Sequence, residues 1–448
     1  MVHKKRSAFL VLTVALILAA FTAGCGSSKN AGESAGADTG ANNGKPQGEK
    51  VSITILSRAS GTSPAAVAFQ NLLKKFMEEN PNIKVVDESL NDENAFNNKL
   101  KTSLATGNVP HIWTNYGGEA FKDYAKNIAL DLQPYLDEDK EWSGAFLPLL
   151  DTWQYKDLKG TYGVPSEFYS IAIYYNKELF EKIGMAPPAT VEEMKAVAEK
   201  FKAIGITPMA IADKENFRGG HMLTNLSLTK FGQAKTEALV SGQAKWNDAD
   251  MVSLLQLMKD WQDAGILGNN LVTTDNNAIT ANFIAGKSAM LYEGSWGISQ
   301  LAESALKDKI GVIPFPGFAD SPDTKNVWFG GAGGYSVSKE AKGAELEAAI
   351  KLTKYLTSVD AFKYYLEFTK GGVYPVKMTV DPTAVDPITQ AFMAAQATAS
   401  EFKGELYAYD PIAQLQDKVR NEIQGMFAGN PPQKAADNIQ SFVESNRK

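Results

Sequence analysis

The segment Glu293-Gly294-Ser295-Trp296-Gly297 sets a large flat indole directly after an apolar run and between two glycines. Glycine lets a backbone come close to another group, and an indole can cover the flat face of a ligand. We therefore interpret Trp296 as a binding platform. A core tryptophan at the end of a strand would give the same local sequence, so both interpretations stay open at this point.

Other polar and aromatic side chains stand at the ends of predicted strands. One such strand ends in Asn115 and Tyr116 ahead of two glycines, and ligands of open α/β sheets lie beyond the carboxyl ends of strands. A surface turn would explain either residue equally well. A second cluster joins a carboxylate to two aromatic rings just after a proline, and core packing alone does not account for it: Glu167, Phe168 and Tyr169.

Loops and glycine-rich turns add further candidates. The predicted loop 213–221 carries Phe217 beside Arg218, an aromatic ring next to a cation. Gly331 lies in a glycine-rich turn that leads into a strand, where backbone amides could approach a ligand. Tyr374 follows a Gly-Gly pair that opens the C-terminal helical portion. We predict a ligand contact at each of these positions.

The sequence lacks the residues that a phosphate-binding loop or a His-rich or Cys-rich metal site would need. Gly286-Lys287-Ser288 looks like the end of a phosphate-binding loop, but Ala281 stands where that pattern requires a glycine. His111 and His221 are the only histidines beyond the N-terminal leader, and Cys25 is the only cysteine, so count alone excludes a His-rich or Cys-rich metal site. No cofactor is expected.

One enzyme class stays as an alternative. A glycoside hydrolase needs two carboxylates that face a sugar, and Glu167 with Glu293 could supply them. Sequence spacing says nothing about the distance between the two groups. The rest of the inventory consists of hydrogen-bonding and stacking groups without a complete catalytic set, which favours binding without turnover.

The order of predicted elements favours an α/β fold. Residues 51–57 alternate apolar and polar side chains, as a strand does, and Ser63-Pro64 begin an amphipathic helix that stops at Asn80-Pro81. A strand at 83–87 follows, which predicts a right-handed parallel crossover. At 448 residues the chain is longer than one core usually supports, so we expect two domains.

The N-terminus has the features of an export signal. A basic start precedes the apolar run 8–21, which is too short to span a bilayer comfortably. Thr22-Ala23-Gly24-Cys25 resembles a lipobox, in which the cysteine is acylated and becomes the mature N-terminus; a plain secretory signal with an incidental cysteine is the alternative. We expect 1–24 to be a signal peptide and 25–50, rich in Gly, Ser and Asn, to be a flexible tether.

The charge balance argues against a polyanionic partner. The chain carries 45 Lys and Arg against 51 Asp and Glu, a formal net charge of −6. A moderately acidic body with mixed-sign helices favours neither nucleic acid nor broad adhesion to anionic lipid. Both partner classes are therefore set aside, apart from the membrane contact that a lipid at Cys25 would provide.

Several motifs, taken in order behind the lipobox, resemble the extracellular solute-binding proteins of the maltose-binding type, which deliver carbohydrates to ABC importers. The resemblance covers roughly Val51 to Phe442. Its most specific parts are Tyr175-Asn176-Lys177-Glu178-Leu179-Phe180 with Gly184 and Thr190-Val191-Glu192-Glu193, Gly286-Lys287-Ser288-Ala289-Met290 running into Gly294-Ser295-Trp296, and Gly311-Val312 with Pro314.

The resemblance implies a two-lobed periplasmic-binding-protein-like fold of type II, in which hinge strands join two α/β lobes and the ligand lies between them. The implied N-terminal lobe is 51–160 plus 317–370, and the C-terminal lobe is 165–313 plus 376–448. The implied hinges lie near 161–164, 311–316 and 371–375.

The resemblance also implies roles for the candidate residues. The tryptophan of the family's Gly-x-Trp segment is the sugar platform, which assigns that role to Trp296. Further implied sugar contacts are Asn115 and Tyr116, Glu167 with Phe168 or Tyr169 beside it, and Phe217 with Arg218. Around Arg58 the chain departs from the family, which has a charged pair there.

The implied protein is not an enzyme. It is a lipid-anchored monomer on the extracellular face of the bacterial cytoplasmic membrane, where it captures a sugar, expected to be an oligosaccharide, and delivers it to ABC transporter permease subunits. A lipid-anchored surface adhesin is a further alternative, and it would show no hinge closure.

Overall fold

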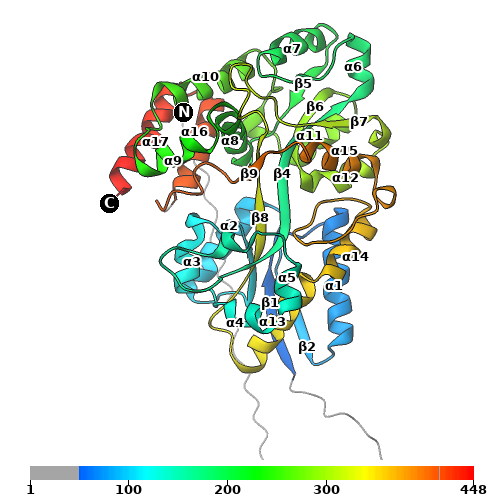
Figure 1. Cartoon of the computed structure of the whole chain (residues 1–448), viewed down its shortest axis with the longest axis vertical. Coiled ribbons are helices and arrows are strands. Elements are labelled where there is room, and N and C mark those ends of the chain that lie inside the picture. Colours follow the sequence, from blue (N-terminus) through cyan, green and yellow to red (C-terminus); the bar gives the residue numbers. More distant parts are fainter. Residues whose placement is uncertain (1–49, 413, 448) are drawn as a thin grey trace, which may run out of the picture. The chain divides into compact units, whose positions relative to one another are not determined.

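The fold is organised around one mixed sheet that runs through both lobes (Figure 1). The computed structural model describes residues 50–412 and 414–447. The predicted signal peptide, Cys25 and the tether up to residue 49 lie outside these described residues. Within the described ranges, no helix is both long and apolar enough to cross a membrane.

Nine strands pair among the described residues. The main order is β2 (Ile83–Asp87), β1 (Val51–Leu56), β3 (Ile112–Asn115), β8 (Val327–Val337), β4 (Val164–Asn176), β6 (Ser288–Gly294) and β5 (Thr207–Ala210). Strand β7 (Ile310–Ile313) also pairs with β4, and β9 (Glu401–Lys403) pairs with β8. The α/β fold class with its two lobes is confirmed.

Strands β4 and β8 lie side by side and belong to both lobes (Figure 1). They pair antiparallel from Val164↔Tyr335 to Ser170↔Gly330. The rest of β4 pairs with β6 and β7, and the end of β8 pairs with β3. A side chain on this shared pair of strands can therefore reach residues of either lobe.

The first lobe forms from local signals that the sequence displays. Ser63 accepts a hydrogen bond from Ala66 N and caps α1 (Pro64–Glu79), and β1 and β2 pair parallel on either side of it. Phe69 and Phe76 of α1 pack on Ile53 of the sheet. The other helices of this lobe are α2 (Glu93–Thr106), α3 (Lys122–Asn127), α4 (Gln133–Glu138), α5 (Lys140–Ala145), α13 (Gly343–Leu356) and α14 (Val359–Thr369).

The second lobe has two cores, one on each side of β4 and β6. The larger contains Met209, Phe329 and Trp261, which is 4% exposed. The smaller contains Tyr174 and Phe392. The helices are α6 (Lys177–Ile183), α7 (Glu193–Ala203), α8 (Phe217–Phe231), α9 (Gln233–Ser241), α10 (Ala249–Asp263), α11 (Asn276–Ile284), α12 (Ile298–Ala302), α15 (Pro387–Gln396), α16 (Leu415–Phe427) and α17 (Pro432–Asn446).

The return to the first lobe lies later in the chain than 311–316. Strand β7 pairs entirely with the second-lobe part of β4, and Phe315 packs in the larger second-lobe core. The hydrogen bond from Val191 N to Gly317 O, 2.8 Å long, holds the following loop to the same lobe. The crossing is β8 itself, so residues 317–326 belong to the second lobe. The glycines at 330–334 form part of this strand and not the turn that we predicted.

The last crossing is also later than 371–375. Val376 packs in the first-lobe core and forms a bridge with Phe146. Lys377 N donates to Ala145 O at 2.7 Å. Because Ile388 of α15 lies in a second-lobe core, the chain crosses between 378 and 388. Residues 376–378 therefore belong to the first lobe, since backbone hydrogen bonds tie them to the end of α5.

Candidate functional site

Trp296 lies on a short 3-10 turn, Ser295–Gly297, that follows β6 directly. It is 42% exposed, whereas Trp246 and Trp261 in the same lobe are 2% and 4% exposed. The interpretation as a core tryptophan is therefore wrong. An indole with a covered side and a free side is what a stacking platform requires.

The two glycines around Trp296 make room for side chains of the same segment. A Cβ atom at Gly294 would lie 2.3 Å from the indole Cη2, so the ring can fold back only over a glycine. A Cβ atom at Gly297 would lie 2.7 Å from Cγ of Glu293. The groups that come close to these glycines are thus the side chains of Trp296 and Glu293.

Phe217 and Arg218 lie beneath the platform and are not on a loop. They begin α8, and Phe217 is 8% and Arg218 0% exposed. A Cβ atom at Gly219 would lie 2.6 Å from Ile423, and one at Gly220 would lie 2.3 Å from a neighbouring hydroxyl. These glycines let α16 approach the helix, which is why a loop-like sequence is helical here. Direct ligand contact by Arg218 is not possible in this structure.

One of the two candidate catalytic carboxylates, Glu293, forms a buried ion pair with Arg218. Arg218 Nη2 donates to Glu293 Oε1 at 2.7 Å, and Glu293 is 2% exposed. The same Oε1 atom accepts from Gly294 N at 2.8 Å. Glu293 is therefore a structural anion in this arrangement.

The strand β4 presents alternate side chains to opposite faces. Tyr169 faces the platform, with its ring centre 6.2 Å from that of Trp296 and 6.0 Å from that of Tyr116. Phe168 instead packs against Phe402, 5.5 Å away between ring centres. Of the two rings expected beside Glu167, Tyr169 is thus the one that shares its face of the strand, because neighbours on a strand point to opposite faces.

Glycines on β8 leave space for the side chains of β4. A Cβ atom at Gly331 would lie 2.9 Å from the hydroxyl of Tyr169, and one at Gly333 would lie 2.2 Å from Oε1 of Glu167. Gly331 thus supports the site by letting Tyr169 lie across the strand. Gly331 lies opposite Tyr169 in the pairing of β8 with β4.

Asn115 and Tyr374 serve the local structure of the chain. The Asn115 amide donates to Ser336 Oγ at 2.7 Å, and its oxygen accepts from Trp153 Nε1 at 2.7 Å. Tyr374 donates to Gly371 O at 2.9 Å. Asn115 is buried, so its polar atoms are already used. Neither residue has a contact with the platform among the described residues.

Tyr116 and Glu167 face Arg58, where the chain departs from the pattern of the family. Burial raises the pKa of the Glu167 carboxyl, while the charge of Arg58 and a hydrogen bond from Tyr116 act against that rise. Arg58 Nη1 in turn donates to Glu93 Oε2 at 2.7 Å. Arg58 therefore belongs to the site, together with Glu93, which we did not predict.

A chain of charged groups continues from Glu93 into the second lobe. Arg420 donates to Glu93 Oε1 at 3.0 Å and to Glu405 Oε1 at 2.7 Å. His221 Nε2 lies 2.8 Å from the same Glu405 oxygen, and its ring centre is 6.2 Å from that of Trp296. The side chains of Arg420, Glu405 and His221 are each less than a tenth exposed.

These charges change one another's acidity. Burial alone would raise the pKa of Glu405, but Arg420 and His221 together lower it to about 2. Burial lowers the pKa of His221 despite the neighbouring carboxylate. At neutral pH the group thus holds an ionised Glu405 between Arg420 and a histidine whose N–H can donate. No local sequence signal marks Arg420, which looks like an ordinary charge on an amphipathic helix.

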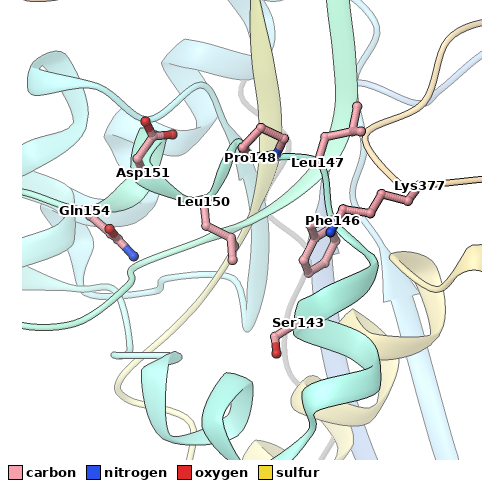
Figure 2. A pocket seen from close by; sticks show the side chains of 8 residues that line it. All are labelled: Ser143, Phe146, Leu147, Pro148, Leu150, Asp151, Gln154 and Lys377. Atoms are coloured by element: carbon pink, nitrogen blue, oxygen red, sulfur yellow. The ribbon is translucent and has the colours of Figure 1, made fainter.

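One surface cavity lies elsewhere, in the first lobe. It measures about 620 Å³ and is lined by Ser143, Phe146, Leu147, Pro148, Leu150, Asp151, Gln154 and Lys377. Figure 2 shows these side chains around the segment that follows α5. None of them belongs to the group around Trp296. The stacking residues and the charged chain, and not this cavity, therefore define the candidate site.

Comparisons with known proteins agree on one family. Residues 71–396 match the family described as bacterial extracellular solute-binding protein. The multiple sugar-binding protein of Streptococcus mutans is 30% identical over 316 residues, 66% of this chain and 69% of that one. The melibiose/raffinose/stachyose-binding protein MelE of Bacillus subtilis is 24% identical over 72% of this chain and 70% of that one.

Solved structures show the same fold. A chitin oligosaccharide binding protein superposes with a TM-score of 0.81 at 25% identity, over 89% of this chain and 99% of that one. The solute-binding protein RafE in complex with raffinose gives a TM-score of 0.71 at 20% identity, over 89% of this chain and all of the other.

Proposed function

Since the chain belongs to the bacterial extracellular solute-binding protein family, we propose that it captures an oligosaccharide at the junction of its lobes and delivers it to the permease of an ABC importer. The half-exposed indole of Trp296 carries this proposal. Sugars present apolar C–H faces and hydroxyl groups in fixed directions, so a stacking ring beside ionised side chains suits them.

Three aromatic rings and two charged side chains share the recognition of the sugar in this proposal. Trp296 covers one face of a sugar ring, with Tyr169 and Tyr116 beside it. Glu167 offers an acceptor next to these rings, and the charge of Arg58 lies beside that carboxyl. Neutral sugars bind through both kinds of contact, and no ionised group on the ligand is required.

Closure of the lobes completes capture. Two ion pairs join α2 of the first lobe to α16 of the second: Glu93 with Arg420 at 3.0 Å, and Lys101 with Asp417 at 3.1 Å. Such contacts form only when the lobes meet, so they favour a closed form in which the permease would meet one composite surface. Hinge closure around a ligand is an established property of periplasmic binding proteins.

The N-terminal segment supplies the attachment in this proposal. A diacylglyceryl group on the Cys25 thiol holds a monomer at the extracellular face of the membrane, and residues 26–50 form a polar spacer. One acyl chain alone would bind reversibly, whereas the two chains of this group give a firmer anchor. The spacer lets the binding protein meet its permease without a membrane span of its own.

The test is incubation with a panel that contains raffinose, stachyose, chitin oligosaccharides and xylo-oligosaccharides, with melting temperature and product formation both followed. A bound sugar at ~100 times its dissociation constant stabilises by roughly 2.7 kcal/mol. We expect binding without products. Turnover that disappears in Glu167→Gln would establish a glycoside hydrolase instead. Small-angle scattering separates transport from adhesion, since an adhesin would keep its radius of gyration at saturation.

A further inference from the structure

The guanidinium of Arg218 lies under the platform and has no access to solvent. Its Cζ atom is 5.1 to 5.8 Å from the centres of three aromatic rings: Phe217, Tyr292 and Trp296. Nη2 donates to Glu293 Oε1 at 2.7 Å and to Asn276 Oδ1 at 2.8 Å. Nε and Nη1 have no hydrogen-bond partner among residues 50–412 and 414–447. The electron-rich ring faces are therefore the groups left to stabilise that side of the cation.

The partner of Arg218 contacts the platform turn on both sides. Glu293 accepts from Gly294 N at 2.8 Å, immediately before the turn. Its side chain also lies against Gly297, immediately after the turn, where no Cβ atom could fit. The ion pair thus touches the indole from below and the backbone on either side of it.

A buried ion pair is weak evidence for a gain in stability, because apolar residues of similar volume often fold as well or better. Stability alone therefore does not explain why Arg218 and Glu293 stand here. A role in orientation does explain the pair. A planar guanidinium whose donors are held by Glu293 gives the indole that stacks on it one preferred angle.

We infer that Arg218, held by Glu293, is a positioning residue for Trp296: it fixes the indole at one angle with its outer face free for a sugar ring. The inference deepens the proposed function and rests on it for the part that concerns affinity. The fixed orientation itself can be observed without any ligand.

The first measurement uses the ligand-free protein. The double variant Arg218→Met/Glu293→Gln removes both charges together, so no buried charge loses its partner. Near-ultraviolet circular dichroism is recorded for this variant and the parent, each with and without Trp296→Phe, and the difference spectrum isolates Trp296. We expect a clear difference spectrum in the parent and a strongly reduced one in the double variant.

The second measurement is affinity for raffinose or stachyose, whichever binds more tightly. In the double variant the indole must lose its freedom when the sugar binds, so the affinity of this variant should be roughly 2- to 12-fold weaker than that of the parent. In a Trp296→Ala background the same double substitution should change affinity little, because the group that it positions is gone. If no sugar binds the parent protein, the proposed function fails while the dichroism still decides the orientation.

Lys235→Met is a control for the loss of a poorly exposed cation elsewhere in the lobe. Lys235 has 8% of its side chain exposed, pairs with Asp248 at 2.7 Å and with Asp250 at 2.8 Å, and lies 5.3 Å from the Phe231 ring. We expect it to lower the melting temperature but to keep the Trp296 difference spectrum. An unchanged spectrum in the double variant, or equal affinity losses with and without Trp296, would overturn the inference. If the double variant does not fold, Arg218→Lys keeps the charge without the planar fork and is judged by the same spectrum.

Discussion

Replacement of Trp296 by alanine should weaken sugar binding far more than it weakens the fold. An aromatic side chain buries roughly 150–250 Å², so the 42% of Trp296 that is exposed leaves roughly 60–100 Å² for a ligand. At ~25 cal/mol per Å² this area is worth about 1.5 to 2.5 kcal/mol. Affinity should therefore fall about 10- to 70-fold.

Calorimetric titration with the sugar that the panel selects measures the loss directly. Trp296→Phe keeps a smaller ring and should lose less. The melting temperature of the ligand-free protein is measured beside it, because truncation of a large buried side chain costs ~3 to 5 kcal/mol of folding free energy. Normal affinity with a collapsed melting temperature would refute the platform.

Trp261 provides the comparison. It is 4% exposed in the larger second-lobe core. Trp261→Phe should lower the melting temperature more than Trp296→Phe does, while the dissociation constant stays the same. The opposite pattern would mean that exposure is a poor guide to which tryptophan meets the ligand.

Three other perturbations test separate parts of the molecule. Glu93→Gln removes the charge that pairs with Arg420 across the two lobes. A hydrogen bond to a charged group is worth about 1.5 kcal/mol or more, so sugar affinity should fall at least ~10-fold in calorimetric titration. Small-angle scattering should show less closure of the lobes at saturation. Burial raises the pKa of Asp213 to about 7 from 3.8, so the folded protein binds this proton more tightly than the unfolded chain and stability falls as pH rises from about 4 to 7. Asp213→Asn should therefore gain stability over the parent in urea unfolding at about pH 8 and little at about pH 4; equal curves at both would contradict the raised pKa. Cys25→Ser should move the protein from the membrane to the soluble fraction or leave it unprocessed, while sugar affinity of the purified domain stays unchanged.

Local patterns were sufficient for the elements that depend on neighbours in sequence. Ser63 and Pro64 predicted the start of the first long helix, and the alternating run 51–57 predicted the strand before it. Trp296 could be singled out because its neighbours in sequence, two glycines at the end of a predicted strand, leave room for a large flat side chain. In each case the physical cause lies within a few residues of the feature.

Features that depend on distant partners were missed or misplaced. Arg218 next to two glycines looked like a loop, because the helix that packs on those glycines is α16, some two hundred residues later. Arg420 and Glu93 each look like surface charges until the lobes bring them together. The glycines of β8 looked like a turn, since the reason for them is the side chains of β4.

The pairing of β3 with β8 has a consequence for the way in which the protein matures. The amide of Asn115 and the hydroxyl of Ser336, which bond across these strands, are 221 residues apart in sequence. A chain that is translocated from its N-terminus exposes the β3 edge until β8 has followed, and an open edge is a template for aggregation. Loop closure over such a distance is also slow. The first lobe therefore cannot complete its sheet until the second-lobe elements that precede β8 in the chain have been made.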